Sequence, residues 1–217
     1  MNDHGIEWVD AVDSSGEDYV AALLEVQNEF YGEYEYVPAV LRDWARGPMV
    51  RGDIVHRQQL GYINGELAAF IIFDTNLKRL VTIGHFMAVL PEFRGRGLAM
   101  VLELHARDTG ILDAAAQGVD LIAYVGECER HMLPLFEKWG FAHLPVDYAE
   151  PYHGNTWPQY GEPQFFDRAL IALPLPDVPL DIPRVASAGA AAFLLDHYQL
   201  PPDHPVVTRC VGVSDDA

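Results

Sequence analysis

The stretch Val89-Leu-Pro-Glu-Phe-Arg-Gly-Arg-Gly-Leu-Ala99 joins two segments of different hydrophobic periodicity. Before it, Leu80 to Val89 is a mainly apolar run, which predicts a buried strand. After it, from Leu98 to Arg107, apolar residues recur at helical spacing. The sequence therefore predicts a strand, a glycine-containing loop and the start of a helix, in that order.

This order of elements is typical of an anion-binding site. Backbone N–H groups of the loop and of the first helical turn converge on one point, where the helix dipole adds partial positive charge. Gly95 and Gly97 have no side chains, so a phosphate can approach the backbone closely. The motif is not a Walker loop, because Leu98 follows Gly97 where that loop has lysine, and it lacks the third glycine of a dinucleotide fingerprint. We therefore expect the loop to bind a diphosphate.

Two motifs of the chain resemble landmarks of the GNAT N-acetyltransferase superfamily. Val89-x-Pro91-x-x-Arg94-Gly-x-Gly97-Leu-Ala99 resembles its acetyl-CoA signature, and Leu133-Pro-Leu-Phe-Glu-Lys-Trp-Gly-Phe141 resembles its helix that ends in Gly-Phe before a strand. Between them, Val119 to Val125 matches the intervening strand. The resemblance covers roughly Trp8 to Leu173. It implies an α/β (α+β) fold with a mixed, mostly antiparallel central sheet flanked by helices.

The resemblance also implies acetyl-CoA as co-substrate and names the residues that meet it. The backbone of Met87 and Val89 is expected to contact the pantetheine arm and the thioester, whose developing negative charge needs a hydrogen-bond donor. At Arg94 the backbone amide, rather than the side chain, is expected to carry most of the binding. The expected cofactor-binding residues are Met87, Val89, Arg94, Gly95, Arg96, Gly97, Leu98 and Ala99.

The implied chemistry is acyl transfer from a thioester to an amine, which requires a deprotonated nucleophile. Deprotonating an alkylammonium costs roughly 4 kcal/mol at pH 7, and a general base relieves this cost. His85, four residues before Val89, is the first candidate base, because arylalkylamine-type members of the family place a histidine at the matching strand position. A hydrogen-bonded core histidine and a wall residue of the acceptor pocket are its alternative roles. Glu127, just past the next expected strand, is the second candidate base, and a match to a helix dipole is its alternative role.

Two positions depart from the family pattern. Ile83 stands where some members carry a glutamate base, and Phe136 stands where many carry a tyrosine that protonates the leaving thiolate. A thiol with a pKa near 8.5 can also leave as an anion. Tyr124, Tyr148 and Tyr152 are substitute acids that the sequence does not rank, with packing as their alternative role. A non-catalytic acyl-CoA-binding or interaction domain is therefore the alternative function.

The expected acceptor is the primary amine of a small molecule, with a protein N-terminus or lysine as the alternative. The aromatic loop Ala149 to Pro163 is longer than a hairpin needs, so it is either a specificity loop or a surface flap or dimer contact. Tyr31, Tyr36 and Trp44 are candidates for the opposite wall of the pocket.

Composition excludes several other classes of function. A formal net charge of −18 disfavours nucleic acid as a partner, and it either steers a cationic amine inward or only confers solubility. No run of eighteen apolar residues and no signal peptide is visible, so no membrane span is expected. Cys128 and Cys210 are the only cysteines, which fits a reducing cytoplasm. Cys128 and His131 lack a second pair at ligand spacing, so we expect no metal.

The chain is expected to consist of an acyltransferase domain, residues 1–173, and an extension, residues 174–217. The extension comprises a proline-rich linker, Pro174 to Pro183, and a helix from Arg184 to Leu200. Because a single helix cannot bury its apolar face alone, it docks either on its own domain or on a second subunit of a homodimer. Towards the N-terminus we expect a strand, two helices and a hairpin that turns at Asn64-Gly65; the first three elements span Ile6 to Val12, Gly16 to Phe30 and Pro38 to Arg46.

Overall fold

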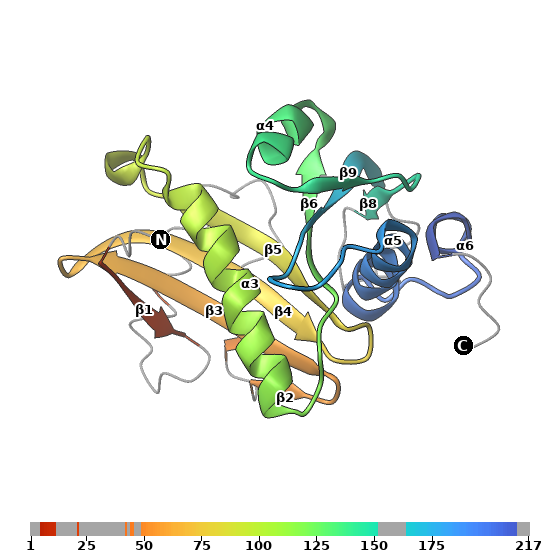
Figure 1. Cartoon of the computed structure of the whole chain (residues 1–217), viewed down its shortest axis with the longest axis horizontal. Coiled ribbons are helices and arrows are strands. Elements are labelled where there is room, and N and C mark those ends of the chain that lie inside the picture. Colours follow the sequence, from red (N-terminus) through yellow and green to blue (C-terminus); the bar gives the residue numbers. More distant parts are fainter. Residues whose placement is uncertain are drawn as a thin grey trace. The chain divides into compact units, whose positions relative to one another are not determined.

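The computed structural model of the chain describes residues 5–11, 21, 42, 44–45, 49–151 and 164–211 (Figure 1). It has a mixed α/β fold in which a largely antiparallel sheet of many strands is flanked by helices, as predicted. The chain divides into two compact units: the first comprises Met1–Asp74 and Gly84–Thr109, the second Thr75–Ile83 and Gly110–Ala217. In the described part of the chain, every helix is too short or too polar to cross a membrane.

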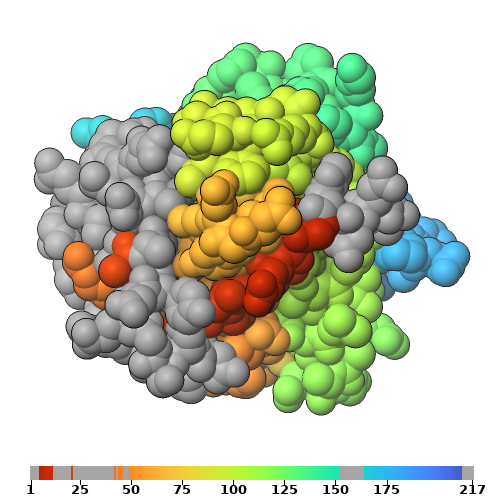
Figure 2. Space-filling model, turned by 90° about the vertical axis from the view of Figure 1, so that its left-hand side faces the viewer, coloured from red at the N-terminus to blue at the C-terminus, as the bar shows by residue number. Residues whose placement is uncertain are grey.

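The first unit contains the predicted hairpin. Its strands follow the order β1-β3-β4-β5, β2 pairs with β3, and their bounds are β1 Ile6–Asp10, β2 Val50–Arg51, β3 Ile54–Ile63, β4 Glu66–Asn76 and β5 Val81–Val89. Asn64 and Gly65 have φ values of 52° and 82°, as expected for the tight turn between β3 and β4. β1 runs antiparallel to β3, with Trp8 opposite Gly61, and lies beside it on the surface (red and orange in Figure 2).

The strand, loop and helix predicted around residues 89–99 are confirmed. β5 ends at Val89, a short 3-10 helix, η1, spans Pro91–Phe93, and the helix α3 spans Leu98–Ala116. Phe93 and Leu98 pack with Ala68 of β4 in a small apolar cluster. This cluster anchors the loop to the sheet from both of its ends.

In the second unit the strands follow the order β6-β9-β7, and all pairs are antiparallel. β8 pairs with β9 as well. The bounds are β6 Ala123–Glu129, η2 Arg130–Met132, α4 Leu133–Lys138, β7 Ala142–Leu144, β8 Ala149–Pro151 and β9 Phe165–Leu173.

The predicted strand from Val119 to Val125 begins too early. β6 starts at Ala123 and runs to Glu129, so Glu127 lies within the strand rather than after it. The Val119 N–H still donates to the carbonyl of Ala114, which closes the end of α3, and Leu121 packs with Ala114 in an apolar cluster. Apolar residues before Ala123 thus belong to the return from the helix, which periodicity alone does not distinguish from a strand.

The C-terminal segment forms α5, Ile182–Ala191, continued by the π-helix η4, Ala192–His197, and then α6, Pro205–Val211. Asp181 caps α5 by accepting a hydrogen bond from the Arg184 N–H at 3.2 Å. At Gly189 a Cβ would lie 2.8 Å from the Val125 side chain, so α5 approaches β6 closely. Of the two predicted arrangements, docking on its own chain is therefore the one observed, within the apolar core of the second unit.

The predicted helices Gly16 to Phe30 and Pro38 to Arg46 fall largely outside the described residues, which there include only 21, 42 and 44–45. Residues 152–163 of the aromatic loop, which include Tyr152, also lie outside the described residues, as do Tyr31 and Tyr36.

Candidate active site

The loop between β5 and α3 uses its two glycines for conformation. Gly95 and Gly97 have φ values of +75° and +80°, in the left-handed region that side chains rarely adopt. A Cβ at either position would meet no atom within 4 Å, so the space in front of both residues is open. The loop therefore presents its backbone to an open surface, as a diphosphate site requires.

The amide of Arg94 makes a hydrogen bond within the loop. Its N–H donates to the carbonyl of Pro91 at 3.2 Å and closes the short helix η1. At the start of α3 the Val101 N–H donates to the Gly97 carbonyl at 3.4 Å, which is the first hydrogen bond of the helix. The amides of residues 98–100 come before it and have no acceptor within the helix. The amides suited to an anion are therefore those at the start of α3.

Both arginine side chains of the loop fold back on it. Arg94 Nε donates to the Val89 carbonyl at 3.0 Å, and Arg96 Nη2 donates to the Glu92 carbonyl at 3.0 Å. The Arg96 guanidinium also lies 5.4 Å from the centroid of the Phe93 ring. These bonds brace the loop against the end of β5 and keep two positive charges beside its open surface.

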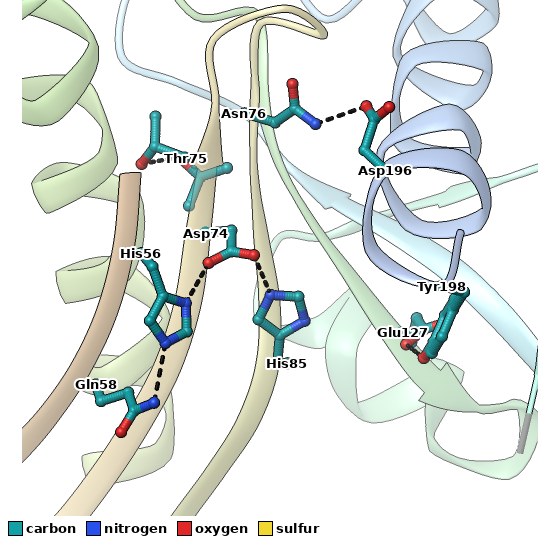
Figure 3. A network of polar contacts seen from close by, with 10 residues as sticks. His56, Gln58, Asp74, Thr75, Asn76, His85, Glu127, Asp196 and Tyr198 are labelled. Carbon is teal, nitrogen blue, oxygen red and sulfur yellow. Dashed lines mark hydrogen bonds and ion pairs between the residues drawn. The ribbon is translucent and has the colours of Figure 1, made fainter. Parts of the chain in front are cut away.

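Further back on β5, His85 belongs to a chain of buried polar side chains in the first unit (Figure 3). Its Nε2 lies 2.9 Å from Oδ2 of Asp74 on β4. The other oxygen, Oδ1, lies 2.5 Å from Nδ1 of His56 on β3. Gln58, two residues along β3, places its Nε2 3.0 Å from Nε2 of His56. Three adjacent strands thus place one carboxylate between two imidazoles.

The electrostatics of Asp74 follow from this arrangement. Burial by itself raises the pKa of a carboxyl group. Attraction to His56 and His85, and the hydrogen bonds with both, outweigh burial and hold the pKa of Asp74 well below its usual range. Asp74 is therefore ionised across the physiological pH range.

The ring of His85 is shielded as well as paired. Its side chain is only 2% exposed, and the ring centroid of Trp44 lies 5.8 Å from it. Trp44, a predicted pocket wall, also makes an edge contact with His56 at 4.7 Å. In the first unit, the side chain of His85 is thus buried beside an ionised carboxylate, four residues before the loop.

Glu127, the second predicted base, lies on β6 in the second unit and is half-buried. Tyr148 donates its hydroxyl to Oε1. Tyr198, which follows η4, donates to Oε2 at 2.8 Å (Figure 3). Burial, and next the negative charge of Glu150, raise the pKa of Glu127 to about 8. Glu127 therefore carries a proton at neutral pH, which makes it a poorer base than the sequence suggests.

Other acidic groups of the second unit are paired with Arg168. Arg168 Nε donates to Glu150 at 2.8 Å, and its Nη1 lies 3.1 Å from Glu129. Glu129 also lies 3.0 Å from His131. These contacts form an ion-pair network on β6, β8 and β9.

The departures from the family pattern lie in the core. Phe136 is buried, with ring centroids of Trp139 and Phe141 at 5.4 and 5.2 Å. Ile83 is buried on β5, and Tyr124 is buried with its ring 6.3 Å from Phe141.

The sequence analysis missed Asp74, His56 and Tyr198. The first two had a signal that could have been used: each is a polar side chain inside a mainly apolar strand, and such a residue is buried only with a partner. Tyr198 had none, because its contact depends on how the C-terminal segment folds back.

Comparison with known proteins completes the description. A model of the Acetyltransferase (GNAT) family matches residues 20–141. A putative acetyltransferase of the GNAT family from Desulfovibrio desulfuricans has a TM-score of 0.51 at 12% identity, covering 78% of this chain and 98% of that one. An acyl-CoA N-acyltransferase from Pseudomonas aeruginosa gives 0.49 at 16% identity, covering 77% and 97%. An acetyltransferase from Bacillus subtilis in complex with CoA gives 0.44 at 18% identity, covering 79% and 98%. No curated protein matches the chain.

Proposed function

Because the chain belongs to the GNAT acetyltransferase family, we propose that it transfers the acetyl group of acetyl-CoA to the primary amine of a small molecule. The observation that carries this proposal is the continuity of the first unit from His85 to the loop. β5 holds a histidine against an ionised carboxylate and, four residues after it, ends in a loop with an open backbone surface.

In this proposal the loop holds the diphosphate of acetyl-CoA. The amides at the start of α3, those of residues 98–100, donate to the phosphate oxygens, and the positive end of α3 adds to the attraction. Arg94 and Arg96 supply charge at the rim of the site. The net charge of −18 does not oppose this, because charges beyond about 8 Å are largely screened at physiological salt.

When bound, acetyl-CoA supplies an activated thioester carbonyl for attack by the amine. The backbone of Met87 and Val89 on β5 positions the pantetheine arm. His85 takes the proton that the amine loses as its bond to the carbonyl carbon forms and the bond to sulfur breaks. The leaving thiolate, with a pKa near 8.5 as a thiol, needs no acid held by the protein.

The environment of His85 supports a small amine as the acceptor. Because the His85 side chain is only 2% exposed, we propose that the group that reaches it is slender, such as a primary alkylamine. The ionised Asp74 beside it attracts a cationic amine. A peptide N-terminus or a lysine side chain shares this chemistry, so both belong in the test.

The test is release of free thiol from acetyl-CoA by the full-length chain. The panel comprises alkylamines, arylalkylamines, amino acids, polyamines and peptides with a free N-terminus or lysine. Turnover with one class of small amine is the expected result. Turnover with peptides alone assigns a protein acceptor, and calorimetric binding of CoA without any turnover assigns a non-catalytic acyl-CoA-binding domain.

Gly97→Glu tests the cofactor site separately. A side chain at a φ of +80° is strained, and a carboxylate at this point repels a diphosphate. Binding of CoA, measured by calorimetry, should be lost, while Gly118→Glu, which changes another glycine of positive φ with open space around it, should retain it. Unchanged affinity in Gly97→Glu would place the diphosphate elsewhere.

A further inference from the structure

We infer that Asp74 is a positioning residue that fixes the ring of His85 so that Nδ1, and not Nε2, accepts the proton of the amine. This inference rests on the proposed function, because it concerns the base of that reaction. It starts from the chain of buried groups Gln58, His56, Asp74 and His85 in the first unit (Figure 3).

When both histidine rings are neutral, the donors and acceptors of this chain can be assigned in one consistent way. An ionised carboxylate only accepts hydrogen bonds, so both ring nitrogens that face Asp74 must carry hydrogen. These nitrogens are Nδ1 of His56 and Nε2 of His85. In neutral His85 the lone pair is therefore on Nδ1, which becomes the basic atom of the ring.

His56 and Gln58 hold the carboxylate in place. With hydrogen on Nδ1, neutral His56 accepts at Nε2, and the Gln58 amide, 3.0 Å away, is the donor. Each oxygen of Asp74 thus has its own imidazole, on β3 and on β5. The carboxylate cannot turn without losing one of them, so the orientation of the His85 ring is fixed by two neighbouring strands.

The placement of these groups favours catalysis over simple packing. A hydrophobic core is stable without an ionised group. The two imidazoles around the Asp74 carboxylate leave its negative charge buried and largely unneutralised. That charge stabilises His85 when the ring takes up a proton during the reaction, because the new positive charge forms 2.9 Å from Oδ2 of Asp74.

The first test is spectroscopic and needs no variant. With 15N-labelled histidine, two-bond N–H correlations report which ring nitrogen carries hydrogen. At neutral pH we expect His85 as the Nε2–H tautomer and His56 as the Nδ1–H tautomer, two opposite forms in one protein. Signals are assigned by their loss in His85→Asn and His56→Asn. A His85 ring with hydrogen on Nδ1 alone would overturn the inference.

The second test is Asp74→Asn. An amide offers one acceptor and one donor, so it cannot accept from both rings, and one of the two tautomers must switch. We expect kcat to fall by about 100-fold, the range in which general bases contribute, with the KM for acetyl-CoA unchanged. The matched control is Asp196→Asn, the same change at a carboxylate that Asn76 and Arg79 bind in the second unit, and it should leave kcat unchanged.

The outcomes separate the two proposals. If the wild-type chain acetylates no amine, the proposed function fails, and the tautomers decide on their own whether Asp74 fixes the ring. If the wild-type chain is active and Asp74→Asn retains both its kcat and the His85 tautomer, the positioning role is refuted while the proposed function stands.

Discussion

Each unit of the molecule buries a carboxyl group among hydrogen-bond donors, and the two groups end in opposite protonation states. Asp74 lies between two imidazoles, and its pKa is held well below its usual range. Glu127 lies between two tyrosine hydroxyls, yet burial and the charge of Glu150 raise its pKa to about 8. The difference teaches that the number of hydrogen bonds does not decide the charge. Imidazoles can share positive charge with a carboxylate, whereas phenol hydroxyls donate a hydrogen bond and remain neutral.

The largest expected effect comes from removing one imidazole. In His56→Leu the ionised Asp74 loses its contact with the His56 ring, and the Gln58 amide loses the ring nitrogen that it faces. A hydrogen bond to a buried charged group contributes about 1.5–3 kcal/mol, and its loss leaves the charge of Asp74 less well compensated. Urea denaturation should show this loss in the free energy of unfolding. A loss below that caused by Tyr198→Phe would mean that Asp74 is not ionised, and the contrast between the units would disappear.

The next largest effect is on catalysis, and it shows whether His85 or Glu127 is the base. His85→Ala should lower the acyl-transfer rate by about 100-fold while CoA affinity, measured by calorimetry, stays nearly unchanged. Glu127→Gln should leave the rate within a few-fold of wild type, because Glu127 already carries a proton at neutral pH. If Glu127→Gln loses as much activity as His85→Ala, both residues belong to the reaction and the division between a catalytic and a structural carboxyl group is wrong.

The contrast also shows what a sequence can and cannot predict here. The strand, loop and helix around Gly95 and Gly97 are local, so periodicity and glycine positions were enough to predict them. The predicted start of β6 was wrong, because apolar residues before Ala123 pack against the end of α3 instead of pairing in the sheet. The roles of Asp74 and Tyr198 depend on which strands and helices meet, and that information is not present in the spacing of residues along the chain.

A smaller effect distinguishes Glu127 from Asp74: the free energy of unfolding depends on pH differently for the two carboxyl groups. The pKa of Glu127 is raised from 4.5 to about 8, so its contribution to stability is fully present below about pH 4.5 and is lost as pH rises through 8. The slope is at most about 1.4 kcal/mol per pH unit for one proton. Glu127→Gln should flatten this part of the stability curve, measured by urea denaturation at several pH values.

The contribution of Asp74 to stability depends on pH with the opposite sign. Because its pKa is lowered, its contribution is present above the unfolded value of 3.8 and is lost only as pH falls below it. Asp74→Asn should therefore change the acid side of the curve, whereas Glu127→Gln changes the slope between pH 4.5 and 8. A slope in that window that survives in Glu127→Gln would show that another group causes it.

The smallest effect is expected from Tyr198→Phe, which removes one hydroxyl and keeps the ring that stacks 6.3 Å from Phe193. The lost hydrogen bond to Oε2 of Glu127 contributes about 1 kcal/mol to the free energy of unfolding. That bond also favours the ionised carboxyl, so its removal should raise the pKa of Glu127 further and move the loss of stability to higher pH. The sign is diagnostic, because a hydroxyl that favoured the protonated form would shift the curve to lower pH. Such a shift would mean that Glu127 donates its own proton to Tyr198 and that phenols, like imidazoles, can decide the charge of a buried carboxyl group.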